Sequence, residues 1–344
     1  MDNLYIIESP LQALCALEVS LAKKNESHAI IARLSSGDRA RNDKQIIDIL
    51  SKRKWDFESI IKYSFYNTAM LNNIESKFFL LNIEKKFKNK VSSLYIGEFR
   101  SSFMHMVRVT TNSPKVFLLD DGAASVKVIK NYIDKNYYYP YDSFYPMNRL
   151  KKTIFKFIYK NHIDIEVMNK KIKILTAFSD QNSNSIEKLE FINIKKLLKG
   201  NKSIDNSLVY YYGSKYSEVG IISRDYEYLF LNNIKKFYND RNKKIVYFAH
   251  RDETEEKLNY ISQELGFTIV VSDTMAELHL LESEVLPSEI SGAYTSVLNN
   301  IKVIFPEINL RSFKLEKEQV SQKWRMDIEL IYDYYRNLDI PIEK

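Results

Sequence analysis

The sequence predicts an α/β protein of two domains, each with a mainly parallel sheet, and three observations indicate this. The chain has 344 residues, which is long for one hydrophobic core and ordinary for two. Hydrophobic residues make up 45% of it, enough apolar surface for both cores. Short runs rich in β-branched and aromatic residues alternate with helical patterns. This alternation is typical of parallel sheets covered by helices.

The first half of the chain opens with a short apolar strand at 3–9. Ser9 is suited to cap a helix and Pro10 to begin one, so we expect a sharp turn into a helix over 10–24. A further helix is expected over 43–53. The other strands expected in this half are 28–34, 93–99, 115–121 and 172–178.

Residues 180–206 are polar at both ends and contain no strand signal, so we place the domain connection there. This gives Rossmann-like domains over 1–195 and 196–344. Strands are expected in the second domain at 207–214, 243–250, 267–273 and 302–306. Helices are expected at 224–241, 252–266, 275–283 and 321–340. The last of these is expected to pack back on the first domain, and a capping box of Asp252 and Glu255 is expected to start the second.

The cysteine count and the hydropathy of the sequence indicate the cellular compartment of the protein. The single cysteine, Cys15, allows no disulfide framework and no cysteine metal site, which fits a reducing cytosol. No secretion signal opens the sequence, and no run of about 18 apolar residues occurs. We therefore expect a cytoplasmic protein.

The net charge of +7 suggests an anionic partner. Lysines and aromatic residues interleave most densely over 148–175, which could rest on the inner face of a membrane with Phe155, Phe157 and Tyr159 as anchors. A solvated lysine face on a core helix is the alternative. The sign of the charge alone does not separate nucleic acid, anionic lipid and a nucleotide substrate as the anionic partner.

Two strand ends carry residues suited to catalysis. Asp120 and Asp121 follow an apolar strand and precede Gly122, which permits a tight turn. One of the two carboxylates could be a general base, and strand alternation would turn the other away; the alternative is an Asx turn. His250 ends another strand next to a helix start, where it could meet a phosphate, or it is a structural histidine.

A third stretch, 286–300, is rich in small and hydroxyl residues ahead of an expected helix. Thr295 and Ser296, with Ser291 nearby, could hold a phosphate together with free backbone N–H groups. Helix capping is the alternative for each of them. No P-loop, no G-x-G-x-x-G fingerprint and no H-E-x-x-H motif occurs, which argues against P-loop NTPases, dinucleotide oxidoreductases and zinc enzymes.

The acidic pair with glycine, the histidine and the hydroxyl pair stand in the order of the bacterial sialyltransferase motifs. The chain resembles that group, most closely glycosyltransferase family 52 and the related bacterial polysialyltransferases. The opening "YIIESPLQAL" also resembles their first strand and loop. Two positions depart from the pattern: Arg251 stands where proline is usual, and Thr295 where serine is commoner.

The resemblance implies a GT-B fold, two Rossmann-like domains facing a cleft, and an inverting, metal-independent transferase without a cofactor. It would move sialic acid or another nonulosonic acid from a CMP donor to a glycan of lipooligosaccharide or capsule. Asp120, more than Asp121, would be the base, and His250 would serve the leaving CMP phosphate. The implied donor-binding residues are Ser9, Gln12, Gly122, Arg251, Glu277 (or Glu282), Ser291, Thr295 and Ser296.

Two alternative functions predict different binding properties. A different GT-B transferase would prefer another nucleotide, and a non-catalytic basic protein would bind membranes or nucleic acid with no affinity for CMP. We expect a CMP-sugar donor and a glycan acceptor that is lipid-linked, with no nucleic acid as partner. A peripheral place at the inner membrane and a homodimer are compatible with this reading.

Overall fold

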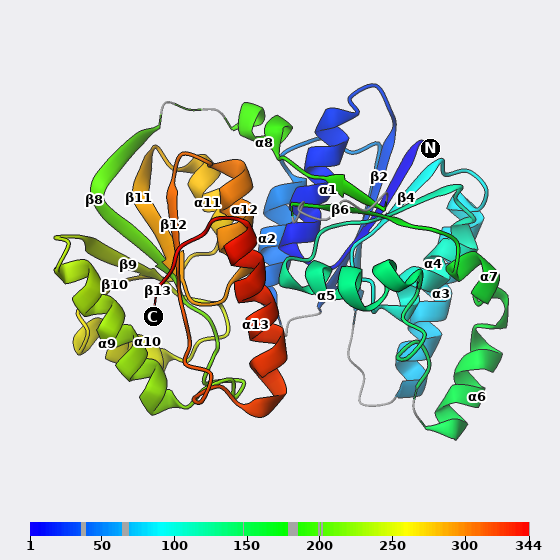
Figure 1. Cartoon of the computed structure of the whole chain (residues 1–344). Helices are drawn as coiled ribbons and strands as arrows, with labels where there is room; N and C mark the ends of the chain where they lie inside the picture. The colour runs from blue at the N-terminus through cyan, green and yellow to red at the C-terminus, as the bar shows by residue number, and fades with distance from the viewer. Residues whose placement is uncertain are drawn as a thin grey trace. The chain divides into compact units, whose positions relative to one another are not determined.

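The computed structural model describes residues 1–35, 39–63, 69–146, 148–177, 185–198, 200 and 202–343. The chain divides into two compact units, Met1–Ile194 and Lys195–Lys344. Each contains one sheet with helices packed on it (Figure 1). Every strand pair within the described residues is parallel. The predicted α/β fold class is confirmed.

The N-terminal unit contains a seven-stranded sheet in the order β3-β2-β1-β4-β5-β6-β7. Its strands are β1 (Asn3–Ile7), β2 (His28–Ser35), β3 (Phe57–Tyr63), β4 (Ser93–Ile96), β5 (Lys115–Leu118), β6 (Lys173–Thr176) and β7 (Ile186–Lys188). The first strand is completely buried, because helices cover both of its faces and four of its five residues are apolar or aromatic. Strands β3 and β7 were not predicted.

The helices of this unit connect the strands in chain order. They are α1 (Pro10–Ala22), α2 (Ala40–Leu50), α3 (Ala69–Phe87), α4 (Ser102–Thr111), α5 (Ala123–Asn131), α6 (Arg149–Ile158), α7 (Ile165–Met168) and α8 (Ile192–Leu197), with 3-10 turns at Ile133–Lys135 and Lys160–His162. Ser9 caps α1 and Pro10 begins it, as predicted. The division between the two units falls within α8.

The C-terminal unit contains a six-stranded sheet in the order β10-β9-β8-β11-β12-β13. Its strands are β8 (Ser203–Tyr212), β9 (Lys244–Phe248), β10 (Thr268–Val270), β11 (Val285–Gly292), β12 (Asn309–Phe313) and β13 (Ile342–Glu343). Its helices are α9 (Arg224–Asn239), α10 (Glu255–Gln263), α11 (Ala276–Glu282), α12 (Ser296–Ile304) and α13 (Gln322–Asn337).

One predicted strand of this unit is wrong. Residues 302–306, with a β-branched pair, were expected to be extended, but most of them belong to α12. Leu298, Ile301 and Ile304 are spaced three apart, so they share one helix face, and all three are buried. Burial of that face outweighs the weak strand preference of the last residues. The hydroxyl-containing run before the helix forms β11 instead.

Candidate active site

The carboxyl edge of the N-terminal sheet contains a point where the strand order reverses, between β1 and β4. Ligands of open α/β sheets bind in the crevice at such a point. Ser9 lies just after β1, Gly97 and Glu98 lie just after β4, and the acidic pair follows the neighbouring β5. The sequence-predicted acidic pair therefore lies beside the switch point of its own sheet.

Asp120 is not open to a substrate. Its side chain is 0% exposed. One carboxylate oxygen accepts hydrogen bonds from the Gly122 N–H (2.9 Å) and the Ser125 hydroxyl (2.7 Å). The other accepts from the Thr176 hydroxyl (2.7 Å) and the Ala177 N–H (2.9 Å). The preference for Asp120 as the exposed base is wrong, because its carboxylate joins the end of β5 to the end of β6.

Asp121 has the properties expected of a base. Its side chain is half-buried, and Oδ1 accepts hydrogen bonds from Gln12 Nε2 (2.9 Å) and Ser9 Oγ (3.3 Å). Among the described residues none donates to Oδ2. Burial, and then the negative charge of Glu98, raises the pKa of Asp121 to about 7. A carboxylate with one oxygen open and a pKa near neutrality is suited to take up a proton.

Gln12 fixes the position of Asp121. Its Oε1 accepts from the Glu8 N–H (2.8 Å), which leaves Nε2 to donate to Asp121. A Cβ at Gly97 would lie 2.0 Å from Gln12 Oε1, so the carboxamide occupies the space that a side chain there would need. Ser9 and Gln12, predicted to bind the donor, contact the acidic pair. Gly97 was missed, although a glycine directly after a predicted strand is a signal for close approach.

Charged side chains surround this edge. Arg33 forms an ion pair with Glu8 and lies over the ring of Phe103, 4.0 Å from its centre. Burial raises the pKa of Glu8, and the Glu98 charge adds to the increase. Glu98 thus acts on both Glu8 and Asp121. Sequence patterns gave no reason to single out Glu98, because its effect arises from strands far apart in the chain.

The C-terminal sheet has its own switch point, between β8 and β11, and His250 follows β9 next to it. The His250 side chain is 30% exposed. Burial lowers the pKa of His250 to about 4, so the ring is neutral at pH 7. Nδ1 lies 3.2 Å from the Asp252 N–H and accepts from it, which leaves the ring hydrogen on Nε2. His250 is therefore a neutral donor.

A buried charge network holds the loop that carries His250. Glu253 accepts hydrogen bonds from the His250 N–H (2.5 Å) and the Tyr247 hydroxyl (2.6 Å), and it pairs with Lys257 (2.7 Å). The Glu253 and Lys257 side chains are completely buried. The predicted capping box is wrong: Thr254 caps α10 by accepting from the Lys257 N–H, and Asp252 precedes the cap.

Thr295 and Ser296 lie where β11 leads into α12, at the same switch point. Thr295 caps the helix by accepting from the Val297 N–H (3.3 Å), and both side chains are half-exposed. The capping alternative thus holds for Thr295, and its hydroxyl hydrogen is not used by that bond. Ser291 is completely buried within β11, and its role as a donor ligand stays a prediction.

The remaining predicted residues differ in exposure. Glu277 lies in the first turn of α11, is buried, and accepts from Asn300 Nδ2 on α12 (2.6 Å). Glu282, the alternative, is exposed at the end of α11. Arg251 is exposed beside His250. Gly122 has φ of +67°, which favours glycine, and it precedes α5.

Within the described ranges, no group of three or more His, Cys, Asp or Glu side chains is arranged to hold a metal ion. In the same part of the chain no helix is long and apolar enough to cross a membrane.

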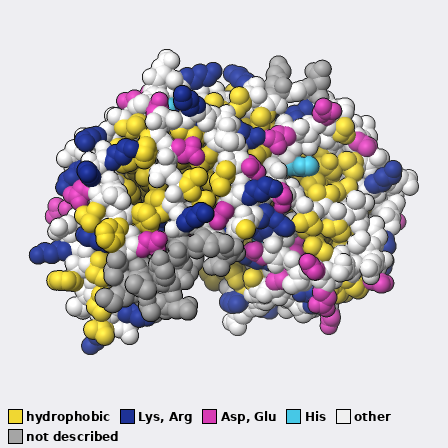
Figure 2. All heavy atoms as spheres, turned by 180° about the vertical axis from the view of Figure 1, so that it is seen from behind, with side chains coloured by type: hydrophobic (Ala, Val, Ile, Leu, Met, Phe, Trp, Pro, Cys, Tyr) yellow, Lys and Arg dark blue, Asp and Glu magenta, His cyan; other side chains and the backbone are white. Residues whose placement is uncertain are grey.

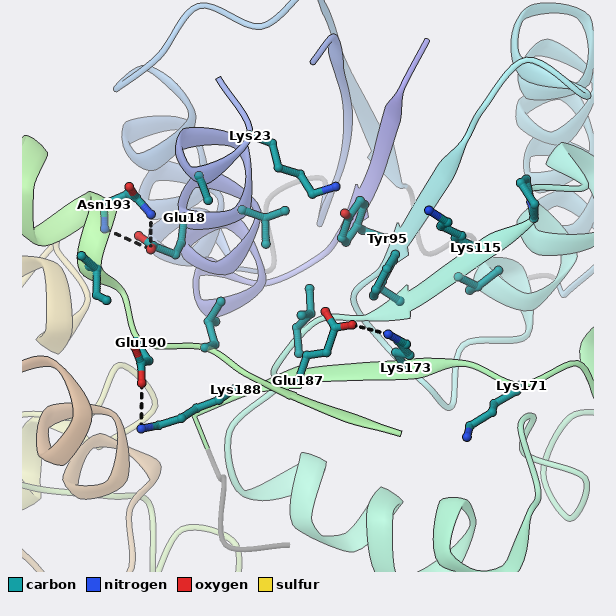
Figure 3. A pocket seen from close by; sticks show the side chains of 18 residues that line it. Glu18, Lys23, Tyr95, Lys115, Lys171, Lys173, Glu187, Lys188, Glu190 and Asn193 are labelled. Carbon is teal, nitrogen blue, oxygen red and sulfur yellow. Dashed lines mark hydrogen bonds and ion pairs between the residues drawn. The ribbon is translucent and has the colours of Figure 1, made fainter. Parts of the chain in front are cut away.

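A cavity of about 740 Å³ lies on one face of the N-terminal sheet (Figure 3). Tyr95 and Phe117, whose rings stack 4.8 Å apart, are among its lining residues. Lys173 pairs with Glu187 (2.5 Å), and Lys188 with Glu190 (2.8 Å). Neither Asp121 nor its contacts Gln12 and Ser9 are among the lining residues. The cavity is therefore separate from the candidate site.

Comparison with known proteins gives structural matches only. No family model matches the chain, and no curated protein matches it in sequence. UDP-GlcNAc 2-epimerase from Neisseria meningitidis, in a structure bound to UDP-GlcNAc, is similar with 9% identity and a TM-score of 0.50, over 99% of this chain and 95% of that one. A putative UDP-N-acetylglucosamine 2-epimerase from Listeria monocytogenes has 10% identity and a TM-score of 0.53, over 98% and 88%.

These likenesses concern the fold. At 9% and 10% sequence identity, they assign no substrate and no reaction to this chain. They do extend over nearly the whole of both chains, and the two sheets carry the alternating helices of this class. The chain therefore has the GT-B fold that was predicted.

Proposed function

We propose that the protein is an inverting glycosyltransferase that moves a nonulosonic acid from a CMP donor to a glycan. The observation that supports this most directly is Asp121, whose open carboxylate oxygen and pKa of about 7 suit it to accept a proton beside the switch point of the sheet. The motif order and the GT-B fold support the same reading. The base is Asp121, since Asp120 is buried and fully hydrogen-bonded.

In the proposed reaction, an acceptor hydroxyl attacks the anomeric carbon of the donor sugar. The new carbon–oxygen bond forms as the bond to the CMP phosphate breaks, and the hydroxyl proton passes to Asp121. A single displacement inverts the anomeric centre. Gln12 and Ser9 hold Oδ1 of Asp121, so Oδ2 is left for the proton.

The departing phosphate gains negative charge, and donors in the C-terminal unit fit that charge. Neutral His250 would donate from Nε2, the Thr295 and Ser296 hydroxyls would donate as well, and the amino terminus of α12 adds its partial positive charge. Hydrogen bonds and a helix dipole then stabilise the leaving group without a metal ion. Turnover should therefore be unchanged by EDTA.

The donor nucleotide is the part that needs a direct test. The structural neighbours named above are a UDP-GlcNAc 2-epimerase and a putative one, so an enzyme that uses a UDP sugar, transferase or epimerase, is the second candidate. The purified protein is incubated with a panel of CMP-nonulosonates, with and without oligosaccharide acceptors of bacterial surface glycans, and CMP release is measured. UDP-GlcNAc is run in parallel.

We expect acceptor-dependent CMP release and a melting temperature that CMP raises and UDP does not. Release of UDP, or interconversion of UDP-GlcNAc with its 2-epimer, would favour the second candidate. Affinity for neither nucleotide, together with salt-sensitive binding to polyanions, would leave a non-catalytic basic protein.

A further inference from the structure

Helix α6 has two apolar sides with different surroundings. On the inner side, Phe155 is buried, and its ring packs against those of Phe144, Tyr145 and Tyr159. Phe155 and Tyr159 were predicted to be membrane anchors, and their burial makes that prediction wrong. On the outer side lie Leu150, Ile154 and Phe157, here called the α6 stripe, which are 70%, 42% and 83% exposed.

The α6 stripe is one continuous line on the helix. Its residues are spaced by four and three positions, so they lie on one face above one another. Single exposed apolar residues are common on proteins, but a contiguous line of large ones marks an interaction surface. The neighbouring helix α3, which packs against α6, exposes Phe78 and Leu81 as well. In Figure 2, where α6 lies at the lower left edge, hydrophobic and basic side chains lie next to one another.

The charges around the stripe have a single sign. Residues 149–163 contain five Lys and Arg and no Asp or Glu. Lys151, Lys152 and Lys156 are exposed on the helix, between the stripe residues in sequence. A surface that is apolar along one line and basic beside it complements a layer with an apolar interior and anionic head groups.

We propose that α6 docks on the surface of an anionic lipid bilayer, with Leu150, Ile154 and Phe157 in the acyl boundary and its lysines among the lipid phosphates. Nucleic acid fits less well, because the aliphatic side chains of Leu150 and Ile154 neither stack on bases nor bind phosphates. The single ring of Phe157 offers little stacking. The proposal does not rest on the proposed transferase activity.

Sedimentation with vesicles tests both halves of the proposal. The full chain is mixed with phosphatidylcholine vesicles, with or without phosphatidylglycerol, over a range of salt. We expect binding to the anionic vesicles that salt weakens and little binding to the neutral ones. The triple variant L150Q/I154Q/F157Q should bind at least about tenfold more weakly. The triple variant K151Q/K152Q/K156Q should lose roughly 10²-fold, since each lysine near an anionic surface contributes about fivefold.

Matched variants in the C-terminal unit are the controls. Met326 on α13 is 85% exposed and Leu229 on α9 is 57% exposed, so M326Q/L229Q removes large exposed apolar side chains elsewhere. The exposed residues Lys236, Lys244 and Lys317 give the control for charge. Unchanged melting temperatures would show that every variant folds. Equal binding to neutral and anionic vesicles, or an equal loss in test and control variants, would overturn the proposal, as would preferred binding to RNA or DNA.

A second measurement reports insertion directly. The only native cysteine, Cys15, is buried, so a polarity-sensitive thiol dye should label an introduced cysteine selectively. We expect the dye on F157C to shift its emission to the blue when anionic vesicles are added, and the dye on M326C to show no shift. A shift at both positions, or at neither, would contradict docking through α6.

Discussion

Gln12 donates a hydrogen bond of 2.9 Å to Oδ1 of Asp121 across a position, Gly97, that has no side chain. The segments after three strands therefore form this contact. Helix α1, after β1, carries Gln12; Gly97, after β4, leaves room for its side chain; and Asp121 follows β5. The orientation of Asp121 is therefore set by the fold.

Replacing Asp121 by Asn should reduce turnover by roughly 10²–10⁴-fold while leaving CMP affinity little changed, because the amide cannot take up the acceptor proton. Steady-state kinetics and CMP titration measure the two effects. Asp120→Asn should act differently: its amide would face donors that need an acceptor, which should lower the free energy of unfolding by about 1–3 kcal/mol. Full turnover by a folded Asp121→Asn variant would exclude Asp121 as the base.

Gly97→Ala should lower turnover and also lower the free energy of unfolding. The new methyl group would displace the buried Gln12 carboxamide, so Asp121 loses its strongest donor and the Glu8 N–H loses its acceptor. Gln12→Ala should have a similar effect, and the double variant should be no worse than either single one, because both act on the same bond. Gly200→Ala is the control, since a Cβ there meets nothing within 4 Å. Additive losses would contradict this coupling.

The pH dependence of kcat/KM should show a rise with a midpoint near 7, as Asp121 loses its proton. The charge of Glu98 raises this pKa, so Glu98→Gln should move the midpoint to lower pH. Glu256→Gln, at an exposed carboxylate on α10, is the control and should leave the midpoint in place. A midpoint that is unchanged in Glu98→Gln would mean that another group controls the rise.

The free energy of unfolding should fall with pH over the range in which ionisation of Asp121 raises activity. The pKa of Asp121 is about 7 in the folded protein, well above the 3.8 of an unperturbed carboxyl. The folded state therefore binds the proton more tightly, and the stability that this contributes is present below about pH 4 and lost as pH rises through 7. The free energy of unfolding of Asp121→Asn, measured with denaturant, should not show this fall with pH. Parallel stability profiles for both proteins would be the contrary result.

His250→Ala should lower turnover by roughly 10²-fold and weaken CMP binding, because a donor to the leaving phosphate is lost. Since burial lowers the pKa of His250 to about 4, its removal should not abolish the rise in activity near pH 7. Kinetics of the variant across pH test both statements. A rise near 7 that disappears with the histidine would assign that titration to His250.

Much of the fold could be predicted from local patterns, since the first helix cap and the strand ends that carry Asp121 and His250 follow from periodicity and capping residues. The choice within the acidic pair could not. Strand alternation predicts only that one of the two carboxylates turns away, and the preference for Asp120 came from the family resemblance. The hydrogen bonds from Ser125 and Thr176 that enclose Asp120 form only in the folded unit. The roles of Glu98 and Glu253 also depend on contacts that only the folded sheets create. Sequence patterns show which residues end strands, and tertiary packing decides which of them remain open.

The four hydrogen bonds that the Asp120 carboxylate accepts have a consequence for synthesis of the chain. Two of its four donors, Thr176 and Ala177, are made more than fifty residues after it. While the ribosome is still translating the intervening segment, this carboxylate lacks half of its partners, and the neighbouring loop cannot reach its final shape. Domains generally fold as units during translation. The hydrogen bonds around Asp120 are thus completed only after β6 has emerged, so a nascent chain truncated before that strand would lack two of them.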